Sequence, residues 1–305
     1  MTRHLLSLLS SLAIALALPA SAARADKLKV VTSIETFAAI SRAVGGDKVS
    51  VEALSKGYQD PHFVEAKPSL LVTLAQADLL VYVGLELEKG WLPPLVTNSR
   101  NPRIQPGANG HLDASAGITA LDVPGGPVTR AEGDIHPLGN PHYWVPPVNA
   151  LRVAKEISDR LAKIDPANAA VYEAGLKGFA ETLKSKAPEW SAKANALKGM
   201  KVVSYHKSFS YVSQWLGLVE VGYVEDKPGI PADPQHLAQL IQSMKAQSVK
   251  ALLVESYYNR STANMVAEKA GAKVLVLPSD VGATGEIKAY ADLVDAVLNR
   301  LADGK

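Results

Sequence analysis

Two stretches of this sequence, 172 positions apart (from Val30 to Val202), repeat the same strand–loop–helix pattern. Residues 29–37 read as a short β-branched strand and a polar loop, and an amphipathic helix then continues to a glycine pair. Residues 201–209 open the second half in the same way. The recurring residues are Val30, Val31, Phe37, Ser41 and Gly45 in the first stretch, and Val202, Val203, Phe209, Ser213 and Gly217 in the second. This repetition predicts a duplicated lobe.

Strands and helices alternate in both halves. In the first half, strand patterns cover residues 49–54 and 79–83, and a helical pattern covers 68–76. In the second half, strand patterns cover 251–255 and 273–277, and helical patterns cover 237–246 and 261–270. Such alternation is typical of parallel sheets with helices on both faces. The predicted fold class is therefore α/β, with two similar lobes.

A long helical tract separates the two halves. An amphipathic helix is predicted over residues 149–164, and Asp165-Pro166 ends it. A second helix, over 166–197, would be about 45–50 Å long at about 1.5 Å per residue, and Pro188 should kink it. A helix of this length between two lobes acts as a strut. We therefore expect an N-terminal lobe over 26–165, a linking helix over 166–197 and a C-terminal lobe over 198–305.

The first 25 residues have the features of a cleavable export signal. Arg3 gives a positive N-terminal region, an apolar run covers 5–18, and small-residue cleavage patterns follow Pro19. We expect cleavage after Ala25, because the first predicted strand begins shortly after it. An uncleaved membrane anchor is the weaker alternative, since the apolar run is short for a span of about 20 residues.

Composition limits the chemistry that the exported chain can use. The sequence has 32 Lys and Arg, 30 Asp and Glu, and no Cys. Removal of the signal takes away Arg3 and Arg24 and no acidic residue, which leaves 30 residues of each sign and no electrostatic case for nucleic acid binding. The absence of cysteine excludes disulfides, thiolate metal sites and lipidation of a cysteine. Any metal must rest on His, Asp, Glu or carbonyl oxygen.

Three histidines and one aspartate occupy positions suited to ligand binding. His62 and His142 each follow an x-Pro step, and His206 directly follows a predicted strand. His62 also follows a strand through a short loop, and Asp280 follows the last predicted strand. Ligands of open α/β sheets bind outside the carboxyl ends of the strands. Three neutral imidazoles and one carboxylate would form a tetrahedral site for a divalent metal, zinc first.

The spacing of these residues does not by itself establish a metal site. Separations of 80 residues from His62 to His142, and of 64 from there to His206, fit no local zinc motif. A single histidine in a soluble protein is most often a surface or capping residue. Asp280 could equally be a turn residue or a cap.

The order of motifs resembles the metal-binding solute-binding proteins of bacterial ABC importers for zinc and manganese. The stretches at 60–69, 140–146 and 204–211 are similar to the three histidine ligand motifs of that family. Residues 165–172 are similar to the start of its linking helix, and 253–255 and 275–290 to its closing segments. The similarity covers essentially the whole chain after the signal, in the same order.

The resemblance implies two lobes joined by one long helix, with the metal between them. His62 and His142 would be ligands from the first lobe, and His206 and Asp280 from the second. A histidine at the third ligand position leans toward zinc in this family, whereas a glutamate leans toward manganese. The implied protein is not an enzyme. It is a monomeric periplasmic zinc carrier without a lipid anchor, with an ABC-transporter permease as partner and a periplasmic metallochaperone as a candidate second partner.

The chain departs from the family pattern in its loop and its linking helix. Zinc-type members often carry a His-rich loop before the second ligand. The corresponding stretch here, residues 124–141, is rich in Gly and Pro and is expected to be a mobile surface loop. It contains one histidine, His136. This histidine could pass metal to the site or be inert. The family seldom has a proline where Pro188 stands. Glu65 and Glu255 are interpreted as structural residues rather than ligands.

Three alternative functions stay open. The first is a manganese or iron carrier on the same scaffold. The second is a periplasmic zinc hydrolase, which would have three protein ligands, an open water position and a nearby general base. The third is a surface adhesin, which would need an anchor.

Overall fold

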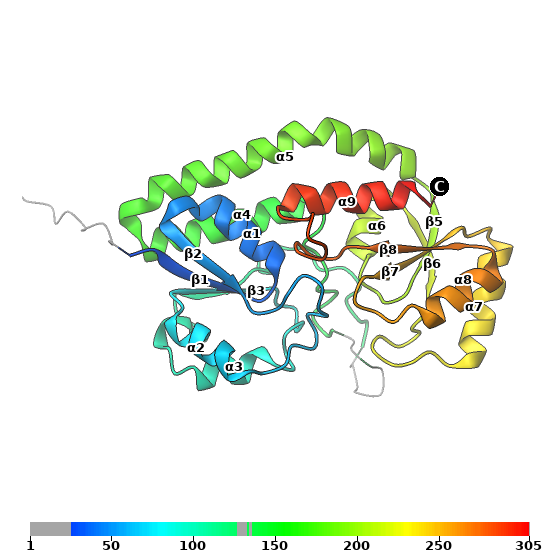
Figure 1. The fold of residues 1–305 in the computed structure, drawn as a ribbon, viewed down its shortest axis with the longest axis horizontal. Coiled ribbons are helices and arrows are strands. Elements are labelled where there is room, and N and C mark those ends of the chain that lie inside the picture. The colour runs from blue at the N-terminus through cyan, green and yellow to red at the C-terminus, as the bar shows by residue number, and fades with distance from the viewer. Residues whose placement is uncertain (1–25, 127–132, 134–135, 305) are drawn as a thin grey trace, which may run out of the picture.

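The computed structural model describes residues 26–126, 133 and 136–304. The expected export signal at 1–25 and much of the expected loop at 124–141 therefore lie outside the described residues. The chain forms two lobes side by side, and long helices run along one side of both (Figure 1). Among the helices of this described part, none combines the length and apolar character that a membrane span requires.

The N-terminal lobe is built on a four-stranded parallel sheet with the strand order β2-β1-β3-β4. Its strands are β1 (Leu28–Thr32), β2 (Val49–Ala53), β3 (Leu79–Tyr82) and β4 (His111–Asp113). Its helices are α1 (Glu35–Gly45), α2 (Pro68–Gln76) and α3 (Leu92–Asn98), with short 3₁₀ turns at Gly46–Lys48 and Pro102–Ile104.

The C-terminal lobe repeats this topology, with the strand order β6-β5-β7-β8 and only parallel pairings. Its strands are β5 (Lys201–Ser204), β6 (Val219–Tyr223), β7 (Ala251–Glu255) and β8 (Lys273–Leu277). Its helices are α6 (Ser210–Leu216), α7 (Pro234–Ala246), α8 (Ser261–Ala270) and α9 (Tyr290–Ala302). The first strand of each lobe is an inner strand that pairs with the second and third. The prediction of two similar α/β lobes is confirmed.

Two helices connect the lobes. Helix α4 (Pro147–Ile164) is followed by a 3₁₀ turn, Pro166–Asn168, and then by α5 (Ala169–Leu197), so the helix predicted over 166–197 is α5 with a tighter first turn. Helix α5 arches over both lobes (Figure 1). Pro188 lies inside α5 and does not end it.

Specific contacts hold α5 against each lobe. On the N-terminal side, Gly175 lets the helix approach α1 closely, since a Cβ at this position would lie 2.1 Å from the carbonyl oxygen of Val44. On the C-terminal side, Asp295 of α9 accepts hydrogen bonds of 2.7 Å from Trp190 and from Lys186. The linking helix is thus fixed at both ends, as a strut requires.

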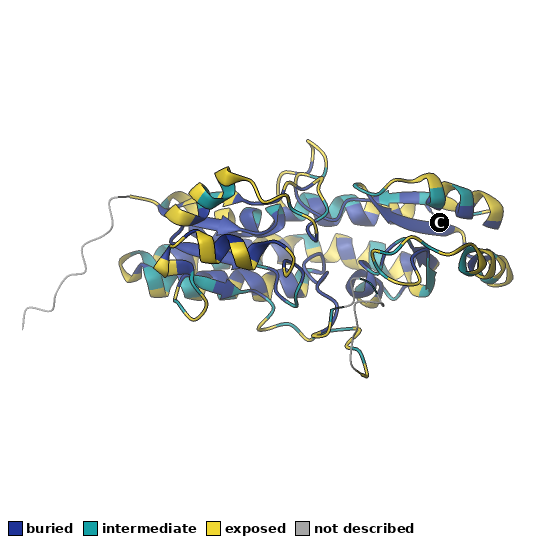
Figure 2. Cartoon of the chain, turned by 90° about the horizontal axis from the view of Figure 1, so that it is seen from below, coloured by how far each residue is buried: buried dark blue, intermediate teal, exposed yellow. Residues whose placement is uncertain are grey.

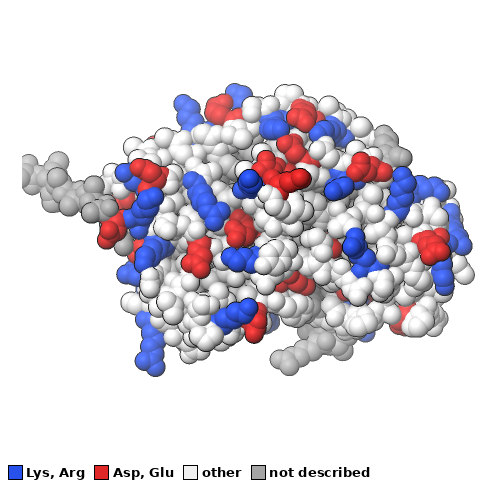
Figure 3. Space-filling model, viewed as in Figure 1, with Lys and Arg blue, Asp and Glu red and all other residues white. Residues whose placement is uncertain are grey.

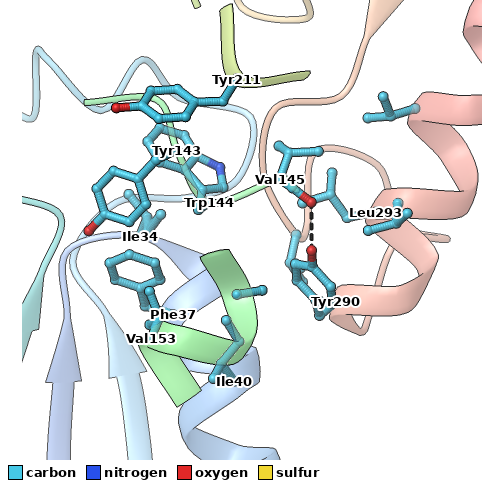
Figure 4. Close-up of a cluster of buried hydrophobic side chains, with 14 of the residues drawn as sticks. Ile34, Phe37, Ile40, Tyr143, Trp144, Val145, Val153, Tyr211, Tyr290 and Leu293 are labelled. Atoms are coloured by element: carbon cyan, nitrogen blue, oxygen red, sulfur yellow. Dashed lines mark hydrogen bonds between the residues drawn. The ribbon is translucent and has the colours of Figure 1, made fainter. Parts of the chain in front are cut away.

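The largest hydrophobic core runs through both lobes. It is formed by one face of each sheet and by helices α1, α4, α5 and α9, while α2 and α3 cover the other face of the first sheet and α7 and α8 that of the second. Figure 2 shows the strands in the buried interior, with exposed residues on the outer faces of the helices. At the junction, the Tyr290 hydroxyl donates to the carbonyl oxygen of Val145 (Figure 4). This shared core disfavours a wide hinge between the lobes.

Basic and acidic side chains are interspersed over the face drawn in Figure 3, as the balanced charge of the sequence suggests. Several elements were not predicted, namely β4, β6, α3 and α9. The two strands among them lie at the edges of their sheets. Strand β4 has only three residues, and β6 is partly exposed along its length. Short, half-exposed edge strands lack the continuous apolar run by which buried parallel strands are recognised.

Candidate metal centre

Three imidazoles converge between the lobes. His62 lies in the loop after β2, His142 precedes α4, and His206 follows β5. One ring nitrogen from each of these residues lies within 4.8 Å of the others, and the three side chains are 7%, 5% and 3% exposed. The ring centroids of each pair are 5.0–5.4 Å apart. Among the described residues, these three histidines form a group of side chains that could hold a metal ion.

Each of these histidines has an acceptor at Nδ1. His62 pairs with Asp60 Oδ1 at 2.7 Å, His142 with Asn140 Oδ1 at 2.9 Å and His206 with Glu225 Oε2 at 2.9 Å. These contacts favour the tautomer with the proton on Nδ1, which leaves the Nε2 lone pair free. The Nε2 atoms of His62 and His142 are buried and have no hydrogen-bond partner among the described residues. Because buried polar atoms are normally satisfied, these atoms fit a site made for a metal ion.

The first two histidines are positioned by the same local device. In Asp60-Pro61-His62 the Asp60 carboxylate accepts a hydrogen bond of 2.9 Å from the backbone N–H of His62, and in Asn140-Pro141-His142 the amide oxygen of Asn140 does the same. Each side chain therefore closes a small turn and also holds the ring of the histidine it precedes. The sequence signal for this geometry is the Asx-Pro-His triplet itself.

His206 is oriented by a residue that the sequence analysis did not identify. Glu225 lies two residues beyond β6 and is 8% exposed. Its Oε2 atom accepts from His206 and also from the backbone N–H of Gly229 at 2.9 Å. A glutamate just past the carboxyl end of a strand could have been a signal, but β6 was itself not predicted.

The environment keeps the His142 imidazole neutral, and it keeps Asp60, the carboxylate that supports His62, charged. Burial lowers the pKa of His142 well below its usual range, and the neighbouring His62 and His206 lower it further. For Asp60, burial raises the pKa, but the hydrogen bond and charge of His62 outweigh this effect and lower it overall. Neutral imidazoles backed by carboxylates are strong ligands for a borderline divalent metal.

Asp280, the fourth residue expected at the site, does not belong to this group in the described structure. It is buried after β8, and its carboxylate accepts hydrogen bonds from the backbone N–H groups of Glu35 (3.1 Å) and Thr36 (2.6 Å) and from the Thr36 hydroxyl. Burial raises the pKa of Asp280 to about 7, against the lowering effect of these donors. Asp280 lies at the start of α1 because the first N–H groups of a helix lack intrahelical partners and attract a carboxylate.

His136 is a further imidazole at the cluster, and its role was left open by the sequence. Its ring stacks on His62 with a centroid separation of 5.4 Å and meets the edge of His142 at 6.3 Å. Burial lowers its pKa to about 3, and His62 and His206 contribute to the same shift. With His142 and His206 it lines a pocket of about 460 Å³ that opens beside the cluster.

Two further histidines, and the two glutamates interpreted as structural, lie in surroundings of a structural kind. His111 contacts the carbonyl oxygen of Ile104 at 2.8 Å, and His236 contacts that of Tyr223 at 2.8 Å. Glu65 pairs with Lys67 on the surface at 3.3 Å. Glu255 ends β7, fully buried. None of these four belongs to the histidine group within the described ranges.

Comparison with known proteins extends this picture. A family model described as the periplasmic component A of a zinc-uptake complex matches residues 30–304. The iron ABC transporter substrate-binding lipoprotein MtsA of Streptococcus pyogenes serotype M1 is 28% identical over 83% of this chain and 79% of its own length. The manganese ABC transporter substrate-binding lipoprotein PsaA of Streptococcus pneumoniae is 26% identical over 93% and 91%. A crystal structure of a ZnuA deletion mutant with zinc bound superimposes with a TM-score of 0.74 at 26% identity, over 92% of this chain and 98% of its own.

Proposed function

Because the chain belongs to this family of periplasmic zinc-uptake components, we propose that it captures zinc between its two lobes and delivers it to an ABC-transporter permease. Members of the family are solute-binding transport proteins rather than enzymes, and a substrate-binding protein of an ABC importer implies a permease partner. The observation that carries the proposal is the convergence of His62, His142 and His206, each supported at Nδ1 and with ligand atoms within 4.8 Å of one another.

The identity of the metal is proposed from the chemistry of the donors. Three neutral imidazoles favour zinc over manganese, which prefers carboxylate and other oxygen ligands. The second candidate is a manganese or iron carrier, because relatives similar to this chain are named for manganese and for iron. A carboxylate ligand would make the site more acceptable to these metals.

The proposed ligand set is His62, His142, His206 and Asp280. For Asp280 to bind the metal, its carboxylate has to leave the N–H groups of α1 and the hydroxyl of Thr36. The metal would then compete with the N-terminus of α1 for the same side chain. This exchange requires a movement of Asp280 or of the loop after β8, while the shared core disfavours a wide movement of the lobes.

The metal preference can be tested by competition on the purified apo protein. Calorimetric titration with zinc in the presence of excess manganese should give the same stoichiometry as zinc alone, with little loss of affinity. Tighter binding of manganese or iron(II) than of zinc would transfer the proposal to the second candidate. The variant H206A should lose zinc binding, whereas H236A, with a histidine outside the cluster, should retain it.

Export and assembly are proposed with the function. We expect a monomer that is released into the periplasm by cleavage after Ala25 and carries no lipid, with a periplasmic metallochaperone as a candidate zinc donor. Mass spectrometry of the protein isolated from the periplasm should give a chain that starts at Asp26. A retained signal, or a mass increased by a lipid, would contradict this proposal.

A further inference from the structure

His136 has the properties of an unused ligand at the proposed metal site. Its Nε2 atom is buried and has no hydrogen-bond partner among the described residues, as is the case for Nε2 of His62 and of His142. Three buried and unsatisfied imidazole nitrogens therefore belong to rings that pack against one another. A histidine that only closed the pocket would be expected to satisfy its ring nitrogens or expose one of them.

The ring of His136 also interacts with the backbone after β3. This interaction, with Leu85, raises the pKa of His136 against the larger lowering effect of burial. We assign it to Nδ1, because Nε2 is buried without a partner among the described residues. Nε2 then keeps its lone pair, as in the histidines that Asp60, Asn140 and Glu225 support.

The backbone that receives His136 is an unusual turn at the end of β3. Leu85 and Glu86 have φ angles of 49° and 68°, in the left-handed region that non-glycine residues seldom adopt. The buried Glu88 carboxylate holds this turn by accepting from the N–H groups of Val83 at 2.7 Å and Gly84 at 3.2 Å. The position of the Leu85 carbonyl is therefore fixed by the N-terminal lobe.

Asp280 is bound to the N-terminus of α1 in the same structure. His136, like Asp280, lies outside the group whose ligand atoms are within 4.8 Å of one another, so its ring has to move closer to share a metal with them. We propose that His136 binds the metal through Nε2 together with His62, His142 and His206, and that Asp280 is not required for this four-imidazole state. The inference rests on the proposed metal site, and in this state His136 takes the place of Asp280 in the ligand set. A site with four imidazoles would discriminate more strongly against manganese than one with a carboxylate.

The test is a direct observation of the histidine rings. Long-range proton–nitrogen NMR spectra of the mature chain with ¹⁵N-labelled histidine report the state of each ring nitrogen, with and without one equivalent of zinc. We expect four Nε2 resonances to change from the free to the metal-bound type, while those of His111 and His236 stay unchanged. In H136F, which fills the space without a ligand, one of the four should be absent. In D280A all four should remain.

The affinity for zinc gives a second readout. H136F should bind zinc at least about tenfold more weakly than the wild type, because loss of an outer-shell partner alone costs about 10–100-fold. A change of only three resonances in the wild type, with unaltered affinity in H136F, would overturn the inference. That result would leave the proposed function intact, provided that H62A still abolishes binding. Retention of zinc binding by H62A would instead contradict the proposed site itself.

Discussion

The two lobes share a topology, but equivalent positions have different tasks. Counted from the matching inner strands, His206 of the second lobe corresponds to Ile34 of the first, 172 residues earlier. Ile34 is fully buried in the shared core next to Phe37 (Figure 4) and directly precedes α1. His206 belongs to the group of three converging histidines. The same strand end thus leads into a helix N-terminus in one lobe and into a proposed metal ligand in the other.

Because of this difference, the N-terminus of α1 competes with the proposed metal for Asp280. In the first lobe, the segment after β1 runs directly into α1, whose first N–H groups bind Asp280 of the second lobe. The three histidines, in contrast, are held at Nδ1 by Asp60, Asn140 and Glu225, which leaves Nε2 for a metal. Duplication of a scaffold therefore does not duplicate its chemistry. We expect the histidines to be preorganised and Asp280 to be exchangeable.

The largest effect is expected from removal of a preorganised imidazole. The variant H206A should weaken zinc binding by more than about a hundredfold, beyond the range seen for outer-shell partners. Calorimetric titration against the wild type measures this effect, and H111A in the first lobe serves as the matched control. Equal affinities in H206A and H111A would exclude His206 as a ligand.

The supports of the histidines should have the next largest effect, and they allow the two lobes to be compared. D60N acts on His62 in the first lobe, and E225Q acts on His206 in the second. Each should reduce zinc affinity by about 10–100-fold while the other histidines stay in place. Circular dichroism would check that the variants fold. If one of the two substitutions left the zinc affinity unchanged, support of the histidines would matter in only one lobe.

The competition between α1 and the metal predicts a gain of affinity. In T36V the hydroxyl that donates to Asp280 is lost, while the volume of the side chain is nearly kept. One hydrogen bond contributes about 0.5–1.5 kcal/mol. If Asp280 is a metal ligand, zinc should therefore bind about two- to tenfold more tightly in T36V, and the gain should vanish in T36V/D280A. A weaker affinity in T36V would contradict exchange of Asp280 between α1 and metal.

The smallest effect concerns a pair of buried acids, one in each lobe. Glu88 accepts two backbone hydrogen bonds, and burial raises its pKa to about 7. For Glu255, burial raises the pKa to about 8, against the lowering effect of the nearby Ser208 hydroxyl. The unfolded carboxyl has a pKa near 4.5. A raised pKa in the folded state means that the contribution to stability is complete below pH 4.5 and is lost as pH rises through 8.

The raised pKa of Glu255 predicts that the stability of the wild type and of E255Q depends differently on pH. Between pH 7 and 8 the wild type should lose about 1 kcal/mol of stability that E255Q keeps, on the basis of 1.36 kcal/mol per pKa unit. Thermal unfolding at the two pH values would show a Tm decrease of about 2–4 °C in the wild type relative to the variant. E88Q should instead be destabilised at both values, because its amide cannot replace the two-oxygen acceptor. A parallel response of wild type and E255Q would contradict the account.

The sequence predicted the fold and the histidine cluster because both leave local signals. Buried parallel strands such as β7 are continuous apolar runs, and Asx-Pro-His contains both the ring and its support. The position of Asp280 left no such signal, since its donor Thr36 is 244 residues away. Glu225 was missed because its strand is a half-exposed edge, and His136 stood alone in a loop. Contacts between lobes depend on packing that periodicity does not encode.

The central claim is that the three converging histidines bind the transported metal. Diffraction from crystals of the zinc-loaded protein at energies on either side of the zinc absorption edge tests this most directly. We expect one anomalous peak, about 2.0–2.1 Å from Nε2 of His62, His142 and His206, which is the usual zinc–imidazole distance. A peak elsewhere, or none in the presence of stoichiometric zinc, would contradict the claim.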